Sequence, residues 1–218
     1  HGLDSAAAPF IVVHDGMGWV ENMVPTLDSL ISEGRIPPIV AIFLDSGGDD
    51  AQGSQRGLEY DTVSGAFAEF VDSEVLPFVS KECGITLTSD PEGRATLGGS
   101  SGGCCAFTMA WFRPDLFRRV LSYSGTFVNQ QSPFNPDSPL GCWEYHGGQQ
   151  LIANSERKPL RICLCERSPM PKTPLFCEPH PALLTPRDSG LADNPAADNG
   201  HQLPEDTWHN WVMANKRM

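Results

Sequence analysis

The chain has 218 residues, which is enough for one domain with a substantial buried core. Its 15 Lys and Arg against 27 Asp and Glu give a formal net charge of −12, and so acidic a chain repels the phosphates of nucleic acid, which we exclude as a partner. No apolar run approaches the roughly 20 residues that cross a bilayer, so we expect no membrane association.

Short apolar runs predict five strands, and apolar residues at helical spacing predict four helices. In chain order these are strand 9–13, helix 23–31, strand 39–44, helix 62–79, strand 94–98, helix 104–112, strands 120–123 and 160–164, and helix 207–218. Strands that alternate with helices of this length are typical of βαβ units. We therefore expect an α/β fold with a parallel sheet and helices on both faces.

One segment breaks this pattern. Residues 167–204 contain eight of the 19 proline residues and show no periodicity. Such a stretch is a long irregular loop, a disordered insertion or an artefact of the gene model. We treat residues 1–218 as a single domain with an irregular Pro-rich insertion at about 167–204.

The strongest chemical signal is a glycine-rich string between strand 94–98 and helix 104–112. Read as Gly99-Ser100-Ser101-Gly102-Gly103, it matches G-x-S-x-G, the motif that presents a nucleophilic serine on a sharp strand-to-helix turn. We prefer Ser101 to Ser100 as the nucleophile because glycines 99 and 103 stand two residues on either side of it. The alternatives are a flexible turn and a phosphate-binding loop, and the string lacks the lysine of the latter.

A second signal follows the first strand. Acyl transfer needs two N–H donors for the oxyanion, one from the residue after the nucleophile and one from a loop after an early strand. Gly102 is the first candidate, and Gly16 or Met17, in the His-Asp-Gly turn, is the second. No group of His, Cys and Asp residues has the spacing of metal ligands, so we predict neither a metal nor another cofactor.

Taken together, these residues resemble the α/β-hydrolase esterases of the enterochelin-esterase and esterase-D type. The matching strings, all within about residues 9–166, are His14-Asp15-Gly16, Arg56-Gly57-Leu58-Glu59-Tyr60-Asp61, Glu74-Val75-Leu76-Pro77, the glycine-rich string with the strand before it, and Tyr123-Ser124-Gly125-Thr126-Phe127. The resemblance resumes at 208–212. It implies a three-layer α/β-hydrolase fold with a mostly parallel sheet, whose first strands and last strand this chain lacks.

The resemblance also implies a catalytic acid after strand 160–164 and then a histidine. Asp198 is our first choice for the acid, followed by Asp193 and Glu166. The histidine of such esterases follows one more strand, which places it beyond Met218. His201 and His209 follow the acid candidates closely, but we interpret both as structural or surface residues.

The sequence therefore predicts a serine carboxylic-ester hydrolase that works through an acyl-enzyme on a small-molecule ester of the enterochelin, feruloyl or esterase-D class. A truncated or degenerate hydrolase that binds a ligand without turnover, and an acyltransferase with the same site, are the alternatives. An exposed sheet edge favours self-association, so a homo-oligomer is expected. No signal peptide is visible, and we expect a cytoplasmic protein although the start of the sequence leaves the compartment open.

Overall fold

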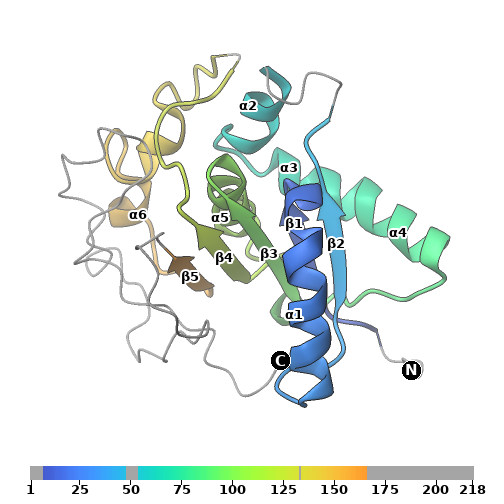
Figure 1. The fold of residues 1–218 in the computed structure, drawn as a ribbon. Helices are drawn as coiled ribbons and strands as arrows, with labels where there is room; N and C mark the ends of the chain where they lie inside the picture. The colour runs from blue at the N-terminus through green and yellow to red at the C-terminus, as the bar shows by residue number, and fades with distance from the viewer. Residues whose placement is uncertain (1–6, 48–53, 133, 166–218) are drawn as a thin grey trace.

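A computed structural model describes residues 7–47, 54–132 and 134–165. Both the Pro-rich segment 167–204 and the predicted helix 207–218 lie outside the described residues. Five strands form one sheet in the order β2-β1-β3-β4-β5, and every neighbouring pair is parallel (Figure 1). The strands are β1 (Phe10–His14), β2 (Val40–Leu44), β3 (Arg94–Gly99), β4 (Arg119–Tyr123) and β5 (Arg161–Cys165). The predicted parallel α/β fold is confirmed.

The strand order creates a switch point between β1 and β3. The chain leaves β1 toward β2 on one side, and it leaves β3 toward β4 on the other. In open parallel sheets, ligands bind in the crevice beyond the carboxyl ends of the two strands at such a point. The ends of these strands, at His14 and Gly99, therefore mark the place to look for a site.

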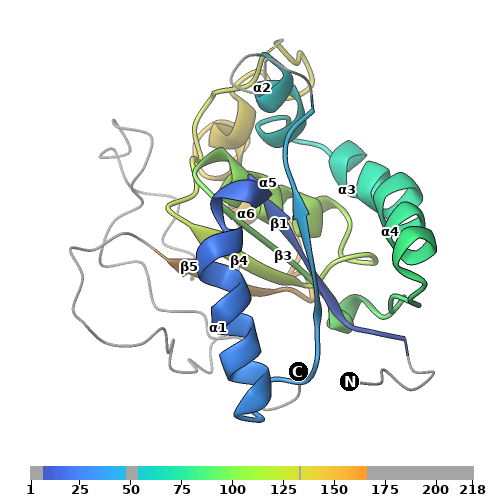
Figure 2. The ribbon, with the colours of Figure 1, turned by 45° about the vertical axis from the view of Figure 1, so that its right-hand side comes forward.

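Helices cover both faces of the sheet (Figure 2). Helix α1 packs on one face, and α5 packs on the other with α2, α3 and α4 beside it. Their bounds are α1 (Val20–Ser32), α2 (Ser54–Tyr60), α3 (Ala66–Phe70), α4 (Leu76–Cys83) and α5 (Ser101–Phe112), and a short α6 (Leu151–Asn154) precedes β5. None of the helices among the described residues is long and apolar enough to cross a membrane.

The larger part of the core surrounds α5. All residues of this helix except Phe112 are buried, as expected for a helix that is apolar on every side. Phe107 stacks on Trp111, and its ring meets those of Phe127 and Tyr145 edge to face, with centroids 5.4 and 5.0 Å away. This packing holds α5, and with it the turn that precedes the helix, in one position.

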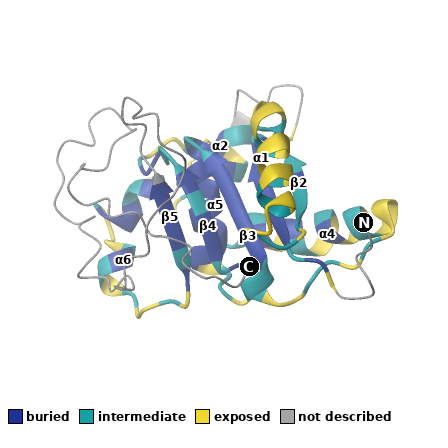
Figure 3. Cartoon of the chain, turned by 60° about the horizontal axis from the view of Figure 1, so that its bottom comes forward, coloured by how far each residue is buried: buried dark blue, intermediate teal, exposed yellow. Residues whose placement is uncertain are grey.

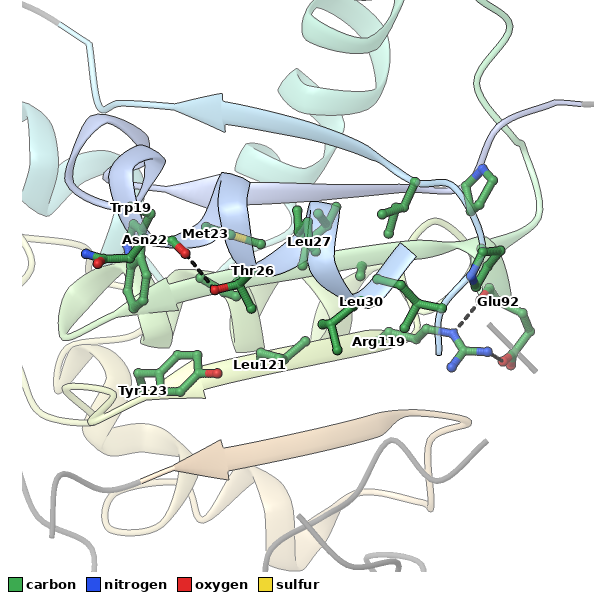
Figure 4. Close-up of a pocket in the computed structure, with 18 of the residues that line it drawn as sticks. Trp19, Asn22, Met23, Thr26, Leu27, Leu30, Glu92, Arg119, Leu121 and Tyr123 are labelled. Carbon is green, nitrogen blue, oxygen red and sulfur yellow. Dashed lines mark hydrogen bonds and ion pairs between the residues drawn. The ribbon is translucent and has the colours of Figure 1, made fainter. Parts of the chain in front are cut away.

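The face under α1 is covered less completely. None of the α1 residues is buried (Figure 3), and a cavity of about 560 Å³ lies between the helix and the sheet (Figure 4). Most of its lining is apolar, with Trp19 and Tyr123 at one end and Glu92 and Arg119 at the other. Ser100 and Ser101 are not among the lining residues.

The helical segments differ from the prediction in several places. Helices α1 and α5 each begin three residues earlier than predicted, and the short α6 was not predicted. Helix α2 was not predicted, because it is only seven residues long and contains Gly57. That glycine packs so closely on the segment after β4 that a Cβ would lie 3.0 Å from the backbone nitrogen of Ser132. The predicted helix 62–79 begins later, at Ala66, and a π-helical turn at Val71–Val75 precedes Pro77, which has no N–H to donate.

Candidate active site

The turn between β3 and α5 is sharp, and its central residue is Ser100. Ser100 has φ 54° and ψ −127°, a positive-φ conformation that non-glycine residues rarely adopt. Backbone hydrogen bonds to the segment after β4 hold it there, from the Ser100 N–H to the Tyr123 carbonyl (3.0 Å) and from the Thr126 N–H to the Ser100 carbonyl (3.1 Å). A strained serine on a strand-to-helix turn is the geometry of a nucleophile elbow.

The glycines around Ser100 have no room for a side chain. A Cβ on Gly98 would lie 2.3 Å from the carbonyl carbon of Gly102, and a Cβ on Gly102 would lie 2.9 Å from Asp15 Oδ2. Real Cβ atoms essentially never come so near other heavy atoms. Gly103 is equally confined, since a Cβ there would lie 2.7 Å from Ser122 Oγ. The positive φ of Ser100, and not the glycines, therefore selects the G-x-S-x-G register centred on Ser100.

The geometry of the turn therefore favours Ser100 over our predicted Ser101 as the candidate nucleophile. Ser101 is the first residue of α5 and is 1% exposed, and its hydroxyl donates to Gln130 Oε1 at 3.2 Å. Ser100 is only partly buried, and its Oγ lies 3.0 Å from Thr126 Oγ1. The string Gly98–Gly103 contains two overlapping G-x-S-x-G motifs, and the sequence pattern alone does not choose between them.

With Ser100 as the candidate nucleophile, the candidate for the first oxyanion donor also changes. The residue after Ser100 is Ser101, so its N–H replaces that of Gly102 as the candidate donor. As the first residue of α5, Ser101 has no intrahelical acceptor for this N–H. The N–H groups of Gly103 and Cys104 both donate to the Ser100 carbonyl.

The loop after β1 lies against the turn between β3 and α5. The prediction of Gly16 or Met17 as the second oxyanion donor requires this contact. Asp15 touches the start of α5 at Gly102, and Trp19 packs against Gly99. Gly16 is buried and has no room for a side chain, since a Cβ would lie 2.6 Å from the Leu44 nitrogen. The Met17 N–H donates to Asp45 Oδ1 at 3.3 Å, and the Met17 side chain is exposed. The structure thus brings the predicted loop to the elbow, while the role of Gly16 or Met17 as a donor stays a prediction.

The family model named Esterase matches residues 4–211. The chain belongs to this esterase family. It is 31% identical to the iron(III) enterobactin esterase of Dickeya dadantii over 126 residues, which is 57% of this chain and 27% of that protein. It is 22% identical to the uncharacterized protein YbbA of Bacillus subtilis over 135 residues, 58% of this chain and 53% of that protein.

Solved structures of the enterobactin esterases are similar to this member of the esterase family. A 2.4 Å crystal structure of the ferric enterobactin esterase of Salmonella typhimurium matches 74% of this chain, with a TM-score of 0.55 and 27% identity. The Shigella flexneri enterobactin esterase with 2,3-dihydroxy-N-benzoyl-glycine matches 71%, with a TM-score of 0.55 and 26% identity. In both cases the chain covers 38% of the solved protein. The predicted α/β-hydrolase fold is confirmed.

The acid and base that the family resemblance implies remain predictions. Asp198, Asp193 and Glu166 lie outside the described residues, and so do His201 and His209. Two histidines are described, and neither forms a hydrogen bond with Ser100. His146 Nε2 lies 2.8 Å from the Phe127 carbonyl, and His14 is enclosed under the elbow. No group of three or more His, Cys, Asp or Glu among the described residues could hold a metal ion.

His14 is a completely buried histidine without a hydrogen-bond partner among the described atoms. It packs against the rings of Tyr60 and Phe67. Desolvation by burial lowers the pKa of His14 from 6.5 to about 4. Burial also raises the pKa of nearby Asp61 from 3.8 to about 6.

These two shifts have opposite effects on stability. Between pH 6.5 and 4 the unfolded chain binds a proton at His14 that the folded chain does not, so this residue makes stability fall as the pH falls. Asp61 does the reverse, because between pH 6 and 3.8 the folded chain holds the extra proton and loses stability as the pH rises. A comparison that keeps Asp61 constant isolates His14.

We therefore expect His14→Phe to reduce the loss of stability in acid. From pH 6.5 to 5, the free energy of unfolding of the wild type should fall by about 1–2 kcal/mol relative to that of the variant. Phenylalanine suits the site because its neighbours are aromatic. Urea unfolding at several pH values measures the difference, and parallel pH profiles for the two proteins would contradict the prediction.

Proposed function

We propose that this chain is a serine carboxylic-ester hydrolase with Ser100 as its nucleophile. The observation that carries the proposal is the backbone of Ser100, with φ 54° and ψ −127°, between a parallel strand and a buried helix. Ser100 Oγ attacks the ester carbonyl carbon and transfers its proton to a general base. The C–O bond then breaks, the alcohol leaves with a proton, and water hydrolyses the acyl-enzyme in a second, similar attack.

The developing negative charge on the carbonyl oxygen needs fixed donors. We assign the first to the Ser101 N–H and the second to Gly16 or Met17 in the loop after β1. The contact between this loop and Gly102 supports the assignment. Asp198 remains our proposed acid, which orients a histidine base.

For the substrate, we propose small-molecule esters of the kind that enterobactin esterases cleave. The support is the family and the likeness to the esterases of Dickeya, Salmonella and Shigella. The chain spans between about a quarter and about a half of the lengths of its curated relatives, so the proposal concerns the reaction at Ser100.

Covalent labelling tests the nucleophile directly. We expect a fluorophosphonate probe to modify the 218-residue chain, with the adduct on Ser100 when the peptides are mapped by mass spectrometry. Ser101→Ala should be labelled and Ser100→Ala should not. A label on Ser101, or equal labelling of wild type and Ser100→Ala, would overturn the assignment. Labelling of Ser100 without hydrolysis of any p-nitrophenyl ester would favour a protein that binds without turnover.

A further inference from the structure

The turn after β1 adopts a conformation that its own sequence does not enforce. Asp15, the residue just before the candidate donors Gly16 and Met17, has φ 52° and ψ 47° in the left-handed region. Aspartate tolerates this region better than most residues but still needs support from its surroundings. That support comes from helix α2, which is distant in sequence.

Arg56 of α2 holds the side chain of Asp15. Its Nε lies 3.0 Å from Asp15 Oδ1, and its Nη2 lies 2.7 Å from Asp15 Oδ2. This two-point geometry fixes the direction of a carboxylate as well as its distance. The guanidinium also lies 5.2 Å from the centre of the Tyr60 ring, and the hydrogen bonds to Asp15 raise the pKa of Arg56.

Tyr60, one helical turn after Arg56, holds the backbone of the same residue. The Asp15 N–H donates to the Tyr60 hydroxyl oxygen at 3.3 Å, and that hydroxyl donates to the Leu44 carbonyl at the end of β2 at 3.4 Å. The Tyr60 side chain is completely buried. Residues four apart share a helix face, so α2 binds Asp15 by carboxylate and backbone together.

The turn after β1, held by Arg56 and Tyr60, packs closely against the start of α5. A Cβ on Gly102 would lie 2.9 Å from Asp15 Oδ2 and 3.1 Å from His14 Cβ. The space between the turn and α5 is therefore filled, and a shift of Asp15 would move the amides of Gly16 and Met17 relative to Ser100.

We propose that Arg56 and Tyr60 are positioning residues, which set the distance between the amides of the loop after β1 and the nucleophile. The inference rests on the proposed function. It adds that helix α2 positions the loop that carries the proposed oxyanion donor. The Arg56 and Asp15 side chains are partly buried, 26% and 37% exposed, and an ion pair with this much access to solvent adds only modestly to stability. The arrangement should therefore affect turnover more than folding.

The test compares Arg56→Gln, Arg56→Lys and Tyr60→Phe with Arg113→Gln in the 218-residue chain. Arg113 is a matched control, because it also makes a two-point contact with a carboxylate, that of Asp115 (2.9 and 2.6 Å), but lies just beyond the far end of α5. We expect Arg56→Gln to lower kcat for p-nitrophenyl butyrate about 10- to 100-fold, because a misplaced oxyanion donor weakens only the transition state. KM should change by less than about threefold.

The other variants sharpen the result. Arg56→Lys keeps the charge but loses the two-point contact, so it should recover only part of the rate. Tyr60→Phe should lower kcat about three- to tenfold, and Arg113→Gln should match the wild type. Asp15→Asn combined with Arg56→Gln should be no slower than the slower single variant, since both break one contact.

The outcomes separate the two proposals. If fluorophosphonate labels Ser100 in the wild type and the Arg56 and Tyr60 variants turn over like Arg113→Gln, the positioning role is wrong and the nucleophile stands. If the wild-type chain is not labelled at Ser100, the proposed function fails, and the positioning role fails with it. If Arg56→Gln does not fold by circular dichroism, the results of Arg56→Lys and Tyr60→Phe decide.

Discussion

Ser100→Ala is expected to lower kcat/KM for p-nitrophenyl butyrate by about 10⁴- to 10⁶-fold, the loss seen when a serine hydrolase is deprived of its nucleophile. The neighbouring Ser101→Ala should reduce kcat/KM by less than about tenfold, because the alanine keeps the N–H that we propose as an oxyanion donor. Its missing hydrogen bond to Gln130 should cost about 1 kcal/mol of stability. Initial rates of the two variants and the wild type, measured at equal concentrations of folded protein, make the comparison.

The pair of variants is informative because the two serines are adjacent and chemically identical. Any general disturbance of the turn would affect both variants, whereas loss of the nucleophile affects one. Equal loss of activity in the two variants would show that the turn is merely structural. A large loss in Ser101→Ala alone would restore the first interpretation of the motif and contradict the assignment to Ser100.

Gly98→Ala is expected to destabilise the folded chain by about 3 kcal/mol or more. The new Cβ would lie 2.3 Å from both the carbonyl carbon and the carbonyl oxygen of Gly102. Both are backbone atoms of α5, which packs directly on β3, so neither can move aside as a flexible side chain would. The midpoint of urea unfolding should shift down with an unchanged m value, since the same surface is exposed.

Gly18→Ala is the matched control for this prediction. A Cβ on Gly18 would meet no described heavy atom within 4 Å, and the backbone there is not left-handed. Its effect should stay within about 0.5 kcal/mol. If Gly98→Ala were as stable as Gly18→Ala, β3 and α5 would not be as closely joined at the elbow as the structure shows.

The order of strands and helices could be predicted because it depends on local patterns. Runs such as Ile39–Leu44 are apolar and short enough to be strands, and all five predicted strands lie within one or two residues of those observed. Helix α2 was not predicted, because contacts with segments far away in the chain stabilise it. One of these is the close approach of Gly57 to Ser132.

The amino-acid sequence by itself determined that a serine follows a parallel strand and precedes a buried helix, with glycines around it, and it determined that a Gly-containing turn follows the first strand. Only the tertiary structure places Ser100, and not Ser101, at the strained turn, because the six residues 98–103 contain the motif twice and the choice depends on where β3 ends and α5 begins. It also decided that Arg56 and Asp15 meet, since they are 41 residues apart and the sheet and α2 bring them together.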